Sequence, residues 1–150
     1  MGKKRIIQKT EEELIKEREQ VEKAVTKEVR VAPSEKIQEA RVYISSTYNN
    51  TIITLTDSKG NVISWASAGS IGFKGTKKAT PFAASKVADA ISQVIKKLGI
   101  KKIAIFVKGI GGGRDSCIRS LAAKDFDIVS ITDITPIPHD GPRPPKVRRV

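Results

Sequence analysis

One stretch of the chain, residues 80–108, constrains the fold more than any other. Its first part repeats apolar side chains at helical spacing, with Thr80 suited to the N-cap, Pro81 to the first helical position and Gly99 to the helix stop. Residues 102–108 follow directly and read KIAIFVK, which is apolar on both faces. That pattern is typical of an interior strand covered on both sides. A helix that leads straight into such a strand predicts an α/β domain.

The flanking segments supply the other strands of the predicted sheet. Residues 41–67 contain three short strand-like runs joined by tight turns, which predicts an antiparallel meander. We expect the turn at 48–50 (YNN) to use the tolerance of asparagine for left-handed backbone. A glycine-rich loop then precedes a second helix at 116–125 and a last strand at 126–136. The prediction is a mixed five-stranded sheet, with helices packed on it by strand–helix–strand crossovers.

The two ends of the chain differ from this core. Residues 1–40 read as a basic arm, a charged helix at 10–30 that begins with a capping box at Thr10, and a linker. Residues 41–135 are the predicted α/β domain. Residues 136–150 hold five of the seven prolines, which predicts an extended basic arm that becomes ordered on a partner.

The charge of the chain points to a polyanionic partner. The formal net charge is +12 and the pI is about 10.0. Residues 41–150 carry 18 Lys and Arg against 7 Asp and no Glu, whereas residues 1–40 carry 10 basic and 9 acidic side chains. Nucleic acid is the first candidate and an anionic membrane surface is the second. No apolar run or signal peptide predicts membrane insertion, and a single cysteine fits a reducing cytoplasm.

Groups for catalysis are sparse. The loop KGIGGGRDS at 108–116 lacks the lysine of a P-loop, and no acidic residue follows it at the spacing of a dinucleotide site. His139 is the only histidine, and the aspartates are scattered over turns and helix starts. Cys117 lies on an apolar face and reads as a core residue. We therefore expect no catalysis, cofactor, metal ion or small-molecule substrate.

Two loops suit phosphate binding instead. Lys74, Lys77 and Lys78 lie among glycines, and Phe73 beside them can either stack on a base or anchor the loop to its own core. The other loop has three consecutive glycines before a helix start, followed by Arg114, which we expect to contact phosphate directly. Aromatic residues are scarce on the strands, which disfavours an RRM-type reader.

Four segments resemble the bacterial small-subunit ribosomal protein eleven family: YNNTIITLTDSKGNVISWASAG, GFKGTKKATPFAA, VKGIGGGRDSCIRSL and ITDITPIPHDGPRPPKVRRV. The resemblance covers residues 41–150. It implies a three-layer α/β/α fold of the ribonuclease H-like kind without nuclease activity. It also implies a cytoplasmic location on the small-subunit platform, bound to 16S rRNA near the exit site and the path of messenger RNA. The implied protein neighbours are small-subunit proteins seven, eighteen and twenty-one.

The resemblance also implies which residues face rRNA. These are Asn49, Asn50 and Thr51; Phe73, Lys74, Gly75, Lys77 and Lys78; Lys108, Gly109, Gly111, Gly112, Gly113, Arg114, Ser116 and Arg119; and His139, Arg143, Lys146, Arg148 and Arg149 in the tail.

The chain departs from the family pattern at five positions, two in the glycine loop and three in the tail, where Pro142 and Val147 replace a common cysteine and lysine. Ile110 and Gly112 stand where the family commonly has prolines, so we expect a more flexible free loop. Asp140 replaces a common asparagine, which places a negative charge close to the expected RNA. The helix at 10–30 is not covered by the resemblance.

Overall fold

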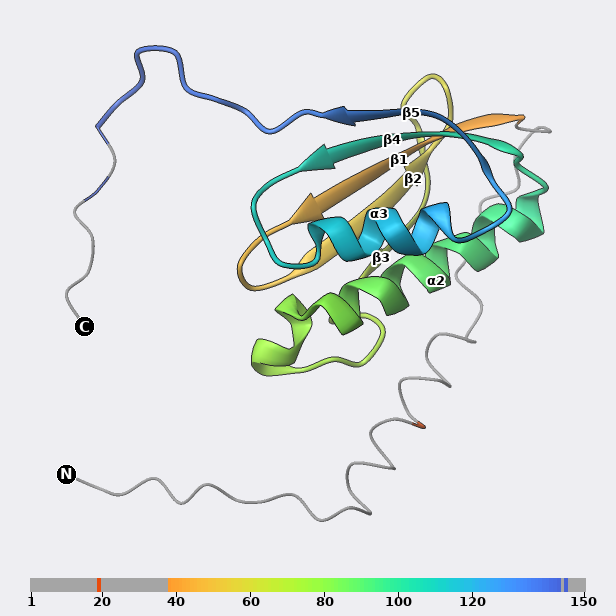
Figure 1. Cartoon of the computed structure of the whole chain (residues 1–150), viewed down its shortest axis with the longest axis horizontal. Helices are drawn as coiled ribbons and strands as arrows, with labels where there is room; N and C mark the ends of the chain where they lie inside the picture. Colours follow the sequence, from red (N-terminus) through yellow and green to blue (C-terminus); the bar gives the residue numbers. More distant parts are fainter. Residues whose placement is uncertain (1–18, 20–37, 144, 146–150) are drawn as a thin grey trace.

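The computed structural model describes residues 19, 38–143 and 145, so the predicted helix at 10–30 and Lys146, Arg148 and Arg149 lie outside the described residues. The described elements follow the chain in this order (Figure 1): β1 (Glu39–Ser46), β2 (Thr51–Thr56), β3 (Val62–Ser67), the 3-10 helix η1 (Gly75–Ala79), α2 (Pro81–Leu98), β4 (Lys102–Lys108), α3 (Arg114–Ala122) and β5 (Asp127–Asp133). The mixed five-stranded sheet and the α/β class are confirmed. The short helix η1 lies in a segment that the sequence predicted to be loop.

The sheet has the strand order β3-β2-β1-β4-β5. β1 is its central strand and pairs antiparallel with β2 and parallel with β4. β3 adds antiparallel to β2, and β5 adds parallel to β4. The carboxyl ends of β1, β4 and β5 therefore lie side by side at the same end of the strands, where β2 begins.

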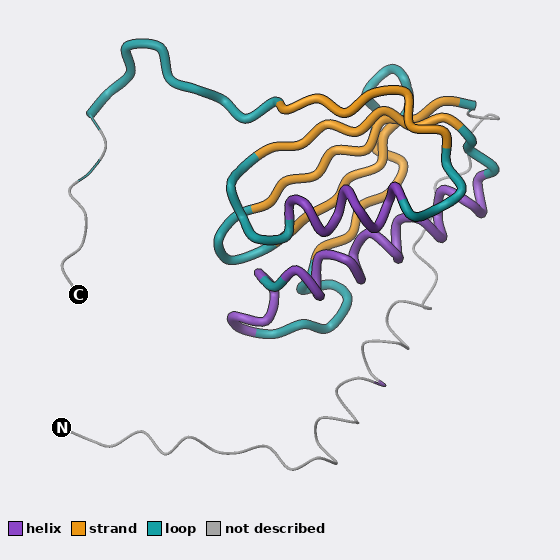
Figure 2. Tube along the Cα trace, viewed as in Figure 1, coloured by secondary structure: helices purple, strands orange, loops and turns teal. Residues whose placement is uncertain are grey.

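Both helices lie on one face of the sheet and beside each other (Figures 1 and 2). The reason is the direction of the crossovers: β3 to β4 through α2, and β4 to β5 through α3, both advance toward the β5 edge. Two right-handed crossovers that advance the same way place their helices on the same side. The described residues thus supply two of the three layers that the resemblance implied. β4 is not covered on both sides by them, because Ala104 and Phe106 stay partly exposed on the second face.

The core forms between the helices and the first face of the sheet. Alternate strand residues such as Val42, Ile44 and Ile105 are fully buried there, in one cluster with apolar residues of α2 and α3. The predicted ends of α2 are confirmed. The Thr80 side chain accepts a hydrogen bond from the Ala83 N–H at 3.2 Å, and Gly99 adopts φ 70 at the C-cap.

β5 forms one edge of the sheet, so one of its sides has no strand neighbour among the described residues. Val129 and Ile131 on this edge strand are 64% and 54% exposed. β5 also pairs irregularly with β4, since the register shifts between Ile103 and Ala104. In the described part of the chain no helix is long and apolar enough to cross a membrane.

Candidate nucleic-acid interface

The predicted rRNA-facing segments come together at the end of the sheet where β1, β4 and β5 terminate, which we call the loop end (Figure 1). The loop end comprises residues 47–50, 73–80, 108–113 and 134–135, and the tail at 136–143 extends away from it (Figure 1). Contacts tie these segments together: the Gly111 N–H donates to the Ser46 carbonyl at 3.2 Å, and the Gly109 N–H donates to Thr135 Oγ1 at 3.1 Å. Segments far apart in the sequence are thus combined into one surface.

The turn at 47–50 is built by a threonine and not by left-handed asparagines. Thr47 Oγ1 accepts hydrogen bonds from the N–H groups of Asn49 and Asn50 at 3.4 and 3.2 Å. Asp140 is the one non-glycine residue with positive φ in the described part of the chain, so our expectation for the asparagines was wrong. A hydroxyl that accepts from the backbone two and three residues on gives the same tight turn without strain. Asn49 remains exposed and Asn50 half-buried.

Thr51, which the resemblance implied to face rRNA, is buried in the structure. Its side chain is 0% exposed, and Gly113 packs so closely that a β-carbon there would lie 2.4 Å from Thr51 Oγ1. A side chain enclosed in this way supports the loop and has no surface to offer to RNA.

The glycines of the 108–113 loop serve close packing more than phosphate approach. A β-carbon at Gly109 would meet the Ser46 carbonyl at 2.1 Å, one at Gly111 would meet the Thr47 carbonyl at 2.3 Å, and one at Gly113 would meet Ala84 at 2.7 Å. The amides of Gly109, Gly111 and Arg114 already donate within the chain. Gly112 is different, because it is exposed and its nearest neighbour would be 3.8 Å away. Of the three consecutive glycines that we expected to approach phosphate, only Gly112 is therefore open to a ligand.

Arg114 is held inside the chain. Its Nη2 donates to Asp133 Oδ2 at 2.6 Å, and its Nη1 donates to the Gly109 carbonyl at 3.0 Å and to Thr135 Oγ1 at 3.4 Å. These hydrogen bonds, with those from Thr135, hold the pKa of the Asp133 carboxyl well below its usual range. Arg114 thus joins the glycine loop to the end of β5, and its charge is matched by a carboxylate.

Sequence reasoning missed Asp133 and Thr135 as the partners of Arg114. They lie 19 and 21 residues further along the chain. The available signal was topological: a parallel strand next to β4 must end beside the loop that follows β4. Polar residues at the end of that strand, such as Asp133, are then within reach of the loop.

The lysines are the accessible cations of the loop end. Lys74, Lys77 and Lys108 are exposed and Lys78 is half-buried, whereas Arg119 is exposed further along α3. No side chain of η1 is buried, which leaves its Lys77 and Lys78 at the surface. Gly75 is exposed with φ 58.

Phe73 anchors its loop to the body of the protein. It packs against the hydrophobic core and meets the Phe82 ring edge-on, with ring centroids 6.0 Å apart. Of the two alternatives left open for Phe73, this contact favours the anchor over a base stack. Ser116, at the start of α3, is half-buried.

The described part of the tail is exposed, including His139 and Arg143. Asp140 adopts φ 52, a left-handed conformation in which Asn and Asp are the favoured non-glycine residues. The replacement of asparagine at this position therefore preserves the turn while it adds a negative charge.

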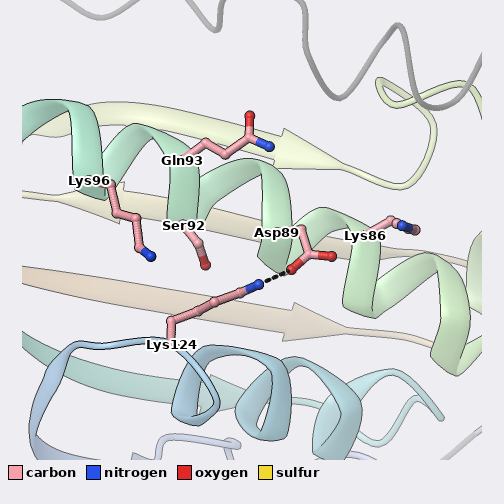
Figure 3. A pocket seen from close by; sticks show the side chains of 6 residues that line it. All are labelled: Lys86, Asp89, Ser92, Gln93, Lys96 and Lys124. Atoms are coloured by element: carbon pink, nitrogen blue, oxygen red, sulfur yellow. Dashed lines mark ion pairs between the residues drawn. The ribbon is translucent and has the colours of Figure 1, made fainter.

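A hollow between α2 and α3 offers a second group of cations, shown in Figure 3. Two of its three lysines pair with aspartates: Lys124 Nζ lies 2.8 Å from Asp89 Oδ1, and Lys96 Nζ lies 3.7 Å from Asp125 Oδ2. The carboxylates offset the attraction of these cations for a phosphate, so this hollow is a weaker anion site than the loop end. Among the described residues, no group of three or more His, Cys, Asp or Glu side chains could hold a metal ion.

Comparison with known proteins places this surface in a family. The family model described as ribosomal protein S11 matches residues 40–149. The small ribosomal subunit protein uS11 of Endomicrobium trichonymphae is 57% identical over 111 residues, which cover 74% of this chain and 85% of the relative. The protein of the same name from Colwellia psychrerythraea is 54% identical over 114 residues, covering 76% of this chain and 88% of the relative.

Proposed function

Because the chain belongs to the ribosomal protein S11 family, and is thus a structural protein of the small ribosomal subunit and not an enzyme, we propose that its loop end binds 16S rRNA on the subunit platform. There it neutralises phosphates and helps to shape the exit site and the path of messenger RNA in cytoplasmic ribosomes. Its protein neighbours in this proposal are small-subunit proteins seven, eighteen and twenty-one. The tail continues the same contact along the RNA.

The observation that supports this proposal is the meeting of exposed cations from separate segments. Lys74 comes from the loop before η1 and Lys108 from the end of β4, and the tail that carries Arg143 leaves the domain from the same loop end (Figure 1). An RNA backbone presents phosphates at regular intervals, and each one neutralised releases a counterion. A surface with cations on several segments fits such a ligand better than it fits a single small anion.

The location is tested by sedimentation of the tagged full-length chain. We expect it to travel with small subunits in a sucrose gradient and to stay with them after a moderate salt wash. A chain found only at the top of the gradient, in cells with intact subunits, contradicts the proposal.

The binding surface is tested by the salt dependence of affinity for 16S rRNA. Replacing Lys74 and Lys108 together by alanine should lower the slope of log K against log salt by about 1.5 units, at roughly 0.7–0.9 per phosphate contact. Lys59 and Lys97 are exposed cations at the opposite end of the molecule and provide the matched control pair. The control pair should leave the slope unchanged. Equal losses from both pairs would show that the attraction is spread over the whole surface.

A further inference from the structure

The second face of the sheet carries a row of side chains that crosses all five strands. We call this face, which points away from α2 and α3, the open face. The strand registers pair Trp65 with Thr54, Thr54 with Tyr43, Tyr43 with Phe106, and Phe106 with Thr132. On β1 to β4 the neighbours of these residues along the strand are buried on the first face, whereas on β5 the neighbours Ile131 and Asp133 are exposed. The three aromatic residues of the strands therefore lie on one line, which the sequence alone did not reveal.

The rings of this row are arranged for stacking. Tyr43 and Phe106 stack on each other with centroids 5.0 Å apart and planes 16° apart. Trp65 lies two strands from Tyr43 with only Thr54 between them, and it is 58% exposed. Two strand spacings amount to about 9.6 Å. This spacing is wider than the roughly 6.8 Å at which a single base would touch both rings, so a base that enters above Thr54 stacks on one ring or the other.

The surroundings of the row favour RNA over a protein partner. Arg41 and Lys108 are exposed and share the open face with Tyr43 and Phe106 by strand alternation. Glu39 lies at the far end of β1, where Lys102 is 3.6 Å away and matches its charge. The hydroxyls of Thr54 and Thr132 lie within the row and can bond base edges or ribose. A mixture of rings, hydroxyls and cations is typical of base-stacking surfaces. Protein interfaces also favour aromatic residues and Arg, so it is the positive charge of Arg41 and Lys108 beside the rings that favours RNA.

We propose that the row Trp65–Tyr43–Phe106 stacks unpaired bases of a single-stranded RNA segment that leaves the loop end across the open face. This inference rests on the proposed rRNA-binding function and adds a second surface to it. Lys108 belongs to both surfaces, so a strand that contacts it at the loop end can continue onto β4. Recognition by stacking tolerates any base sequence, because every base has a flat face.

The test uses Trp65 as its own reporter, since the chain has one tryptophan. The full-length protein is titrated with a single-stranded oligouridylate, with an abasic oligonucleotide of equal length and with an RNA duplex. We expect the oligouridylate to quench Trp65 emission, and the abasic strand and the duplex to leave it unchanged. Quenching of equal size by the abasic strand overturns the proposal, because that strand has phosphates but no bases.

Two substitutions at Trp65 separate stacking from general apolar contact. Trp65→Phe keeps a ring and should bind labelled oligouridylate within about threefold of the natural chain. Trp65→Leu keeps apolar bulk without a ring and should bind roughly tenfold or more weaker. If the two variants and the natural chain bind oligouridylate equally and also bind 16S rRNA equally, the stacking proposal is overturned and a protein partner on this face is favoured. The loop-end function is unaffected by that result. If the natural chain itself does not bind 16S rRNA, the proposed function is contradicted.

Discussion

Gly111 and Gly112 are adjacent residues with opposite surroundings. A β-carbon at Gly111 would meet the Thr47 carbonyl at 2.3 Å and Ser46 Oγ at 2.4 Å, whereas one at Gly112 would have 3.8 Å to its nearest atom. We expect Gly111→Ala to lower the free energy of unfolding by about 1–3 kcal/mol through overpacking. Gly112→Ala should change it by less than about 0.5 kcal/mol, because it is an exposed position without a close neighbour.

Urea unfolding of the two variants measures this difference directly. Equal stability would show that the loop moves away from the turn at 47–50 at little cost. That result would support the flexible loop that the missing prolines suggested, against the packing described here.

Cys117 is a buried thiol, and its Sγ lies 3.4 Å from the Ala84 carbonyl oxygen. Burial raises the pKa of this thiol to about 12, so almost none of it is thiolate at neutral pH. We expect Ellman's reagent at pH 8 to leave the native chain unmodified and to modify one thiol per chain in denaturant. Rapid modification of the native chain would show that α3 opens from α2.

At the scale of elements, the hydrogen bonds of Arg114 join the start of α3 to the end of β5. Because Asp133 matches the charge of Arg114, we expect Arg114→Ala to leave the salt slope for 16S rRNA almost unchanged and to lower thermal stability. This replaces the direct phosphate contact expected from sequence, which implied a slope smaller by about one unit. Filter binding at several salt concentrations distinguishes the two, and a full unit of loss would restore the direct contact.

The same pair gives stability a dependence on pH. The folded pKa of Asp133 is depressed relative to the ordinary carboxyl value of 3.8, and the first cause is the hydrogen bond from Arg114. The stabilisation is therefore fully present above that ordinary value and is lost as pH falls toward the folded pKa. Asp133→Asn should be less stable than the natural chain at pH 7, and the gap should narrow from about pH 5 to pH 2. A gap that stays constant over this range would exclude the carboxylate as its cause.

At the scale of the whole molecule, the excess positive charge lies in the segment that the family model matches. The family model begins at residue 40, and residues 1–40 are almost neutral overall. We expect a chain without residues 1–38 to keep its unfolding midpoint and its salt slope for 16S rRNA. Both are measured on the purified truncated chain beside the full one. A clearly smaller slope would assign part of the RNA contact to the basic residues before Thr10.

Local patterns were sufficient for some of these features and not for others. α2 was predictable because its caps and its apolar repeat lie within 20 consecutive residues. The placement of both helices on one face depends on the direction of two crossovers, which no single segment encodes. Arg114 and Asp133 meet because parallel strands end together, and the aromatic row exists only once four registers are set. The family resemblance supplied the predicted RNA-facing segments, but it could not separate buried Thr51 from exposed Lys74.

The edge strand β5 sets a limit on how long the unassembled protein lasts. In the part of the chain that the structure describes, its outer side has no strand neighbour and lies beside exposed Val129 and Ile131, an arrangement through which two copies can pair. Such pairing accelerates with concentration, whereas incorporation into a subunit removes the chain from solution. We therefore expect copies made faster than rRNA is transcribed to aggregate and not to accumulate as a soluble reserve.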